Sequence, residues 1–568
     1  MHRCLHVYDV VIAIVKHLSL MDRRSVGKDV QAVQTIHSMT LTCSVLYEPA
    51  MDVLWSSLLD LTPIVKSLPP HLWFEAEKQV EESADCVSLL RTVRLQAPPQ
   101  PSDWARAVRN AARVKSIQWN FRRWNRGFEV RWALGDSAMH ALALYSSENS
   151  RPLLSNLCKY EWYWEGLDPQ YFPYIPSLCS DKLESLTIIA HTSLPTASVL
   201  PFAHAAFGVL IARCPKMREL LLYQTSYDDD TLVDLEDKVY ASFFTEVAKL
   251  PCLQSFESHH PLSPSELLLF GRLPRLRNVA MTLYCDADEG LLSTLSSRSL
   301  FPELQSLDIE HDNLPTMIQI VEAIASFSLS KLTVSGIPPE TPAAQLALLF
   351  QTLLPHKYLS YLAVGGTREH LDPGLALRLS LSHLYTVQCE DFRPLLSLHH
   401  LTEVFISPQS FALKLDDAML EAMAQAWPRL QILDIASRLP MHTAPGVTLG
   451  GLLPLSVHCR RLVMVYIAVD VVPPSKEARD RLEEEVKRKR PPCHLSMLTI
   501  HYGADVDSPE PVLREMADFL TDMFPHLQDF DTSHCLPQRR DQRLDDEEDD
   551  IRQHWERFKE VVSEYCAS

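Results

Sequence analysis

The chain has 568 residues, 46% of them hydrophobic and 22% charged, which is typical of a folded protein and excludes wholesale disorder. Its 72 acidic residues outnumber its 53 basic residues and give a formal net charge of −19. This excludes a general nucleic-acid binder, because phosphate binding needs a surplus of Lys and Arg. No glycine-rich phosphate loop, H-E-x-x-H or G-x-S-x-G motif occurs, so we predict no enzyme activity, no metal site and no cofactor.

The 13 cysteines are scattered from Cys4 to Cys566 without any C-x-x-C pair, which favours a reducing cytoplasmic and/or nuclear compartment over secretion. The two longest stretches without Asp, Glu, Lys or Arg, around 191–212 and 439–459, are interrupted by prolines. Neither offers the roughly 20 consecutive apolar residues of a membrane span. We therefore expect a soluble protein with no membrane partner.

The N-terminal residues predict a small module of three helices. The segment Asp9–Leu18 places five apolar residues on one helical stripe, namely Val10, Val11, Ile14, Val15 and Leu18. After a polar stretch, helices are predicted over Ile36–Leu46 and Pro49–Leu59, with the break at Pro49 because proline suits the first turn of a helix. Three helices this short cannot enclose so much apolar surface, so the module is expected to need a neighbour.

One apolar pattern recurs along the rest of the chain: an apolar residue, two variable positions, a second apolar residue, one variable position and usually a third. Residues two apart on a strand face the same way, so each copy predicts a short strand with one buried face. The strong copies are Leu90-Val93-Leu95, Val114-Ile117-Trp119, Leu183-Leu186-Ile188, Met217-Leu220-Leu222, Leu276-Val279-Met281, Leu304-Leu307-Ile309, Leu329-Leu332-Val334, Leu359-Leu362-Val364, Leu401-Val404-Ile406, Leu430-Leu433-Ile435, Leu462-Val465-Ile467 and Leu495-Leu498-Ile500. Weaker copies begin at Leu154, Leu253, Leu381 and Leu527.

The sixteen copies have a mean period of about 29 residues, at the upper edge of the range for leucine-rich repeats. Amphipathic helices are predicted between strands, for example over Thr316–Phe327, Pro342–Leu354 and Ser475–Arg490. Stacked strands can share a core that a single strand cannot form. We therefore predict an α/β fold, an irregular leucine-rich repeat solenoid with a parallel strand stack. The Asn or Cys usual three residues past each strand is absent from the strong copies, so the repeats must be joined in another way.

The N-terminal segments LHVYDVVIAIVKHL (Leu5 to Leu18) and LTCSVLYEPAMDVLW (Leu41 to Trp55) resemble an F-box. The form is that of F-box/leucine-rich-repeat proteins found in large families in mushroom-forming fungi. Its most specific part is Pro49, Ala50, Leu54 and Trp55. The segments DLTPIVKSLP, from Asp60, and LSPSELLLFGRLPRLRNV, from Leu262, also look like that family. The Leu-Pro that usually opens an F-box is replaced by His6-Val7.

The resemblance implies that the module binds the Skp-family adaptor of a cullin-RING ubiquitin ligase. The adaptor-binding residues would be Val10, Val11, Ile14, Val15, Leu18, Leu41, Leu46, Pro49, Leu54 and Trp55. The alternative is that these residues only cap the open end of the solenoid, as every repeat array requires.

Candidate target-binding residues come from a basic, tryptophan-containing stretch at 104–132. Arg122, Arg123, Trp124 and Arg126 would bind an acidic or phosphorylated peptide of an unknown protein target. The alternative, a solvated helix and a strand with buried Trp residues, is favoured. An aromatic cluster between Tyr160 and Tyr174 is either a recognition surface or a packed insert. The paired histidines at 259–260 and 399–400 lack further metal ligands and are predicted to lie in loops.

The predicted organisation is a helical module at 1–60, a connector at 61–88, the solenoid at 89–535, an acidic linker at 536–550 and a closing amphipathic helix at 551–568. We interpret the chain as a non-enzymatic substrate receptor of an SCF-type ubiquitin ligase. Its partners would be the Skp-family adaptor with its cullin ligase and a target protein. The alternative is a leucine-rich repeat interaction scaffold without a working F-box.

Overall fold

The computed structural model of the chain describes residues 7–20, 29–83, 86–117, 130–149, 151–164, 175–191, 208–225, 244–283, 299–338, 341–366, 386–407, 412–435, 446–470, 472–488, 492–501, 510–531 and 559–562. The chain divides into two compact units, Met1–His260 (unit 1) and Pro261–Ser568 (unit 2).

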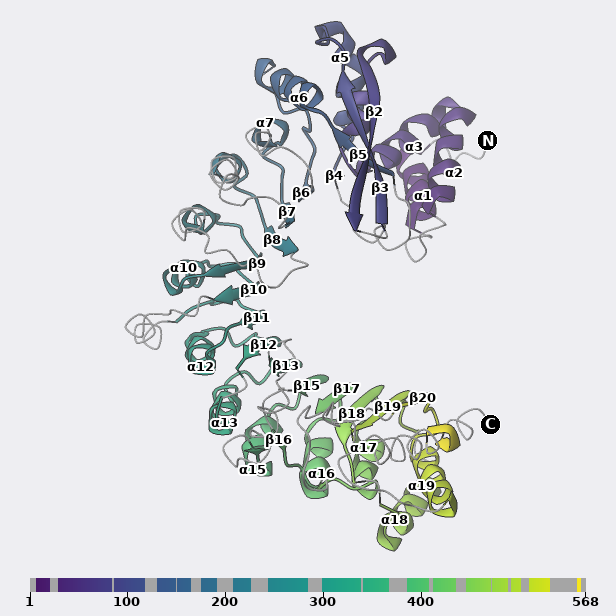
Figure 1. The fold of residues 1–568 in the computed structure, drawn as a ribbon, viewed down its shortest axis with the longest axis vertical. Coiled ribbons are helices and arrows are strands. Elements are labelled where there is room, and N and C mark those ends of the chain that lie inside the picture. Colours follow the sequence, from purple (N-terminus) through teal and green to yellow (C-terminus); the bar gives the residue numbers. More distant parts are fainter. Residues whose placement is uncertain are drawn as a thin grey trace. The chain divides into compact units, whose positions relative to one another are not determined.

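Unit 1 begins with three helices, α1 (Tyr8–Leu20), α2 (Asp29–Thr42) and α3 (Ser44–Ser56) (Figure 1). The break between α2 and α3 falls at Cys43, whose backbone is extended (φ −162°, ψ 160°). Pro49 lies inside α3, so the predicted break at Pro49 is wrong. An interior proline removes one helical hydrogen bond, and the packing of α3 against its neighbours offsets that loss.

A parallel sheet follows in unit 1, with strand order β1-β4-β6-β7-β8-β9. Its strands are β1 (Ser57–Leu58), β4 (Ser116–Ile117), β6 (Lys159–Trp164), β7 (Ser185–His191), β8 (Glu219–Thr225) and β9 (Ser255–Leu262). A separate sheet holds β2 (Trp73–Ser83), β3 (Cys86–Leu95) and β5 (Val130–Leu134), with β3 antiparallel to β2 and parallel to β5. The remaining described helices of unit 1 are α4 (Thr62–Lys66), η2 (Pro70–Leu72), η3 (Pro101–Asp103), α5 (Trp104–Ala111), α6 (Asp136–Glu148) and α7 (Ile175–Leu178).

Two predicted repeat copies of unit 1 are wrong in detail. Leu90-Val93-Leu95 lies in β3 and belongs to the separate sheet, not to the parallel stack. The stack instead begins at β1, which directly follows α3. The copy at Leu154 is out of register by three residues, because β6 begins at Lys159 and the buried pair at this repeat is Leu157 and Tyr160.

Unit 2 continues with parallel strands in the order β10-β11-β12-β13-β15-β17-β18-β19-β20. They are β10 (Asn278–Leu283), β11 (Ser306–Glu310), β12 (Lys331–Ile337), β13 (Tyr361–Gly366), β15 (Glu403–Ser407), β17 (Ile432–Ile435), β18 (Met464–Ala468), β19 (Met497–His501) and β20 (Asp529–Asp531). The helices are α10 (Pro264–Phe270), α12 (Leu314–Ala323), α13 (Ala343–Thr352), α15 (Cys389–Phe392), η8 (Arg393–Ser397), α16 (Asp417–Ala426), η9 (Gly450–Leu452), α17 (Leu453–His458), α18 (Lys476–Lys487) and α19 (Glu510–Met523). Within this unit the helices lie on one side of the strands (Figure 1). The short strands β14 (Thr386–Val387) and β16 (Ala412–Leu413) pair only with each other, so the weak copy at Leu381 contributes no described strand to the stack.

The strands of unit 2 are aligned at the second apolar position of each repeat. The residues that pair along the stack at this position are Val279, Leu307, Leu332, Leu362, Val404, Leu433, Val465, Leu498 and Phe530. All of them are buried. The predicted parallel stack with one shared core is therefore confirmed.

A backbone ladder at the residue before each strand joins neighbouring repeats. The carbonyl oxygen of Gln305 accepts hydrogen bonds from the amides of Ser330 (2.8 Å) and Lys331 (3.0 Å), and equivalent residues repeat this pattern in both units. The hydroxyl of Ser330 donates to the same oxygen at 3.0 Å, and Ser360 and Thr402 donate in the same way to the repeats before them. This ladder joins the repeats without Asn side chains.

The predicted helices between the strands are confirmed over most of their length. Met317 on α12 and Leu346 on α13 are fully buried, as the spacing predicts. Ser475 caps α18 by accepting a hydrogen bond from the amide of Ala478 at 3.2 Å. Leu482 of α18 is buried, but Val486, one turn further along, is 60% exposed, so the predicted apolar face ends before the helix does.

The described end of the chain packs beside the last strand. Residues 559–562 are helical, and Val562 is fully buried. The Lys559 ammonium lies 2.8 Å from a carboxylate oxygen of Asp531 on β20. This is the described part of the predicted closing helix, whereas the predicted acidic linker at 536–550 lies outside the described residues.

Candidate docking surface

The three N-terminal helices form a module with a small core of its own. Its buried residues are Val11 and Val15 of α1, Ile36 of α2 and Ala50 of α3. Met39, Leu46, Val53 and Leu54 pack against them while staying partly exposed. The module therefore holds itself together on one side of α1.

The ten predicted adaptor-binding residues fall into three groups. Val11 and Val15 are buried in the module core, Pro49 is also buried, and Leu46, Leu54 and Trp55 are half-buried. Val10, Ile14 and Leu41 are exposed, with exposed fractions of 37%, 43% and 75%. The side chain of Leu18 lies outside the described residues. Only the exposed and half-buried residues are available to a partner without rearrangement of the helices.

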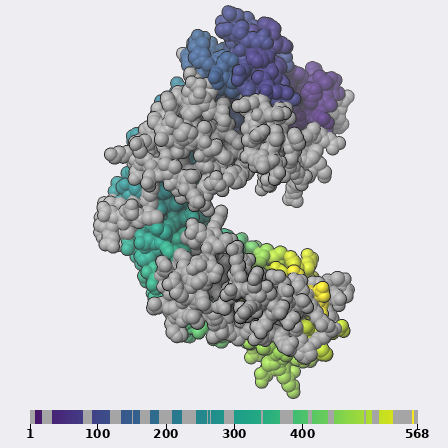
Figure 2. Space-filling model, viewed as in Figure 1, coloured from purple at the N-terminus to yellow at the C-terminus, as the bar shows by residue number. Residues whose placement is uncertain are grey.

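Four more exposed apolar residues of the module were not predicted as site residues: Val7, Tyr8, Val33 and Tyr47. Together with Val10, Ile14 and Leu41 they form what we call the exposed apolar set. Val10 and Ile14 are four residues apart, so they lie along one face of α1 beside the buried stripe, and Val7 directly precedes the helix. That spacing was readable from the sequence. Part of the module is visible at the surface in Figure 2 (purple).

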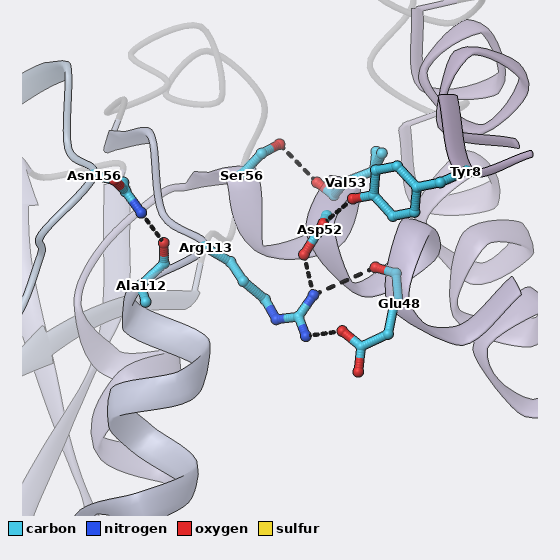
Figure 3. Close-up of polar contacts among 8 residues, drawn as sticks. All are labelled: Tyr8, Glu48, Asp52, Val53, Ser56, Ala112, Arg113 and Asn156. Carbon is cyan, nitrogen blue, oxygen red and sulfur yellow. Dashed lines mark hydrogen bonds and ion pairs between the residues drawn. The ribbon is translucent and has the colours of Figure 1, made fainter. Parts of the chain in front are cut away.

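Arg113, just after α5, fixes the module to the first repeats. Its guanidinium forms ion pairs with Glu48 and Asp52 of α3 and donates to the carbonyl oxygen of Glu48 at 3.3 Å (Figure 3). The Arg113 side chain is only 12% exposed, so this contact is shielded from solvent on the arginine side. The hydroxyl of Tyr8 on α1 donates to Asp52, so the network ties α1, α3 and the start of the solenoid together.

The Tyr8 hydroxyl is held in its neutral form by this network. Its pKa is raised to about 12, first because its proton is hydrogen-bonded to Asp52, and further by burial and by the negative charge of Asp52. A neutral hydroxyl can donate and a phenolate cannot. The bond therefore persists across the physiological pH range.

The backbone continues the connection from the module into the parallel sheet. Strand β1 follows α3 directly and pairs with β4. The amide of Lys115 donates to the carbonyl oxygen of Ser56 at 2.9 Å, and the side-chain amide of Asn156 donates to Ala112 at 2.8 Å (Figure 3). The C-terminal end of the module is thus the first strand position of the stack.

The predicted target-binding residues Arg122, Arg123, Trp124 and Arg126 lie outside the described residues. Within the same basic stretch, Trp104 is buried and stacks on Tyr145 with ring centroids 4.4 Å apart.

The aromatic cluster and the paired histidines show no described ligand site. Tyr160 is buried in the core, whereas the side chains of Trp162, Tyr163 and Trp164 and residues 171–174 lie outside the described part. His259 and His260 lie in β9, so their prediction as loop residues is wrong. Residues 399–400 lie in a turn. Among the described residues, no group of three or more His, Cys, Asp or Glu is placed to hold a metal ion.

A search of the described helices finds none with the length and apolarity needed to cross a bilayer.

Similarity to known proteins comes from solved structures. No protein-family model and no curated protein matches the chain. An internalin from Listeria monocytogenes is similar over 55% of this chain and 81% of that chain, with 15% sequence identity and a TM-score of 0.27.

The in-register parallel strands, their buried apolar triplets and the intervening helices define the chain as a leucine-rich repeat protein. In this fold a stack of repeats presents a long surface.

Proposed function

We propose that the chain is a substrate receptor of an SCF-type cullin-RING ubiquitin ligase. The helical module would bind the Skp-family adaptor, the repeats would bind a target protein, and catalysis would reside in other subunits, in the cytoplasm and/or nucleus. The observation that carries the proposal is the exposed apolar set on a module that also resembles an F-box in sequence.

The energetics of the exposed apolar set favour a partner. Fully burying a side chain such as Ile14 or Leu41 contributes about 1.5–3 kcal/mol. Leu41 is 75% exposed and Val33 is 55% exposed, so much of that free energy is unused in the chain alone. Apolar residues gathered on one small module are typical of a protein–protein interface.

A module that only capped the solenoid would explain the buried residues and the attachment contacts, but not the exposed apolar set. Val11 and Val15 are covered by the module's own helices, and β1 and Arg113 join the module to the repeats. A cap does not require exposed apolar side chains such as those of Val10, Ile14 and Leu41. Attachment through Arg113 would also hold a bound adaptor in a fixed orientation relative to the first repeats.

The test is capture of a Skp-family adaptor by the full chain in co-expression. The test variant is Ile14→Asp with Leu41→Asp, and the matched control is Phe327→Asp, which changes a residue that is 74% exposed in unit 2. We expect the double variant to lose adaptor binding at least 100-fold, since each lost anchor is worth roughly tenfold or more. The control should bind like the unchanged chain.

Absence of adaptor binding by the unchanged chain would overturn the ligase proposal. Equal binding by the double variant would show that the exposed apolar set is not the docking surface. In the first case the chain would stand as a leucine-rich repeat interaction scaffold.

A further inference from the structure

The strand face of unit 2 that points away from the helices carries an unusual set of side chains. It consists of the residues that alternate with the buried ones, in two rows that run across neighbouring strands. The first row is Lys331, Tyr361, Glu403, Ile432, Met464 and Met497, and the second is Thr333, Ala363, Phe405, Asp434 and Tyr466. Lys331 is exposed and the others are half-buried. Both rows are therefore in reach of solvent.

The centre of this strand face is an apolar platform. The rings of Tyr361 and Phe405 lie 5.5 Å apart on neighbouring strands. Ile432, Met464 and Met497 pair in register on β17, β18 and β19, which lie side by side in Figure 1. Aromatic residues and methionine are enriched in the cores of protein interfaces.

The surroundings of the platform are acidic. The described strands of unit 2 contain one lysine and six carboxylates, of which Asp531 is paired with Lys559. The other five carboxylates are Asp308, Glu310, Glu403, Asp434 and Asp529. The pKa of the Tyr361 hydroxyl is raised by burial and then by the negative charges of Glu403 and Asp308. This surface would repel an acidic or phosphorylated ligand.

The platform already holds one cation. The ammonium of Lys331 lies 4.8 Å from the ring centroid of Tyr361, in a cation–π contact between neighbouring strands. The contact shows that this strand face accommodates an ammonium group over an aromatic ring.

We propose that this strand face binds an extended segment of a partner protein that carries Lys or Arg side chains interleaved with aliphatic ones. The aliphatic side chains pack on the platform from Tyr361 to Met497, and the cationic side chains pair with Glu403. The assignment specifies the target chemistry of the proposed receptor, and it rests on the interaction role of the repeats but not on adaptor binding.

The probe is a random library of twelve-residue peptides displayed on phage and selected on the full chain. The best enriched peptide is then synthesised and its affinity measured by fluorescence anisotropy, without any adaptor present. We expect enrichment of Lys, Arg and aliphatic residues, and an affinity that falls as salt rises. Enrichment of acidic or neutral peptides would overturn the proposal.

Three variants locate the binding. Glu403→Lys should weaken binding of the selected peptide at least tenfold. Glu403→Gln should weaken it less, because it removes the negative charge without adding a positive one. Glu484→Lys on α18 makes the same change in net charge on a side chain that is 70% exposed, and it should change affinity less than twofold. Equal weakening by Glu403→Lys and Glu484→Lys would show only general electrostatic attraction and would reject the site.

Tyr466→Ala tests the apolar part of the platform, and its thermal unfolding is measured in parallel to confirm that it folds. A folded variant with unchanged peptide affinity would also reject the site. Because these measurements contain no adaptor, a failed peptide experiment and a failed adaptor experiment are separate results.

Discussion

Gly336 in β12 occupies a position that only glycine fits. Its φ is +80°, and the strand register shifts between Val334 and Ile337 at this point. An added Cβ would lie 2.9 Å from the carbonyl oxygen of His311 and 3.0 Å from its amide nitrogen. These backbone atoms directly follow β11, the preceding strand, and the His311 amide donates to the carbonyl oxygen of Ser335 at 3.1 Å, so they cannot move aside as a flexible side chain would.

Gly336→Ala is therefore expected to destabilise unit 2 by about 1–4.6 kcal/mol. Placing Ala at positive φ costs roughly 1–2 kcal/mol, and forcing a methyl group against backbone adds about 1–3 kcal/mol. The lower entropy of the unfolded chain returns about 0.4–1 kcal/mol. Gly365→Ala is the matched control in β13, since its added Cβ meets nothing within 4 Å and its φ is not left-handed. Its effect should stay within about 1 kcal/mol.

The assay is native-state hydrogen exchange of the amides in β11, β12 and β13, which reports the free energy of opening for each strand. Protection in β12 should fall by the predicted amount in Gly336→Ala and should be retained in Gly365→Ala. If the two variants were equally protected, the argument from backbone geometry at Gly336 would be wrong.

Two further predictions concern charge. Arg113→Met should destabilise the attachment of the module by about 1–2 kcal/mol, because Glu48 and Asp52 lose their partner while remaining partly solvated. This loss should be measurable as faster amide hydrogen exchange in α1 and α3 than in α5. Burial lowers the pKa of His311 and of His356, so the folded state binds protons more weakly than the unfolded state at these sites. Their contribution to stability is present above the unfolded pKa of about 6.5 and is lost as pH falls through the lowered folded values. The urea concentration at the unfolding midpoint of unit 2 should therefore be lower at pH 5.5 than at pH 7.5. His356→Gln keeps a donor for the nearby carbonyl groups and should reduce this difference between the two pH values.

The architecture was largely predictable because the strong triplets from Leu183 onward bury their apolar residues at a repeated backbone position. Leu90-Val93-Leu95 failed because alternation predicts a strand but does not say which sheet it joins. The module surface was harder to predict. Val10 and Ile14 look as apolar as Val11 and Val15, and only the packing of α2 and α3 decides which pair is covered. The role of Arg113 depends on two carboxylates about sixty residues earlier, a distance at which sequence spacing carries no signal.

Because main-chain groups join the repeats, whole repeats can be lost or gained during evolution. The amides of Ser360 and Tyr361 meet the carbonyl oxygen of Ser330 in the same way that Ser330 and Lys331 meet Gln305. A genetic rearrangement that excised one whole period, such as 331–360, would bring Tyr361 to the place of Lys331 with these bonds intact. The length of the chain can therefore vary by complete repeats, and the variable strand positions can be substituted without disturbing the backbone ladder.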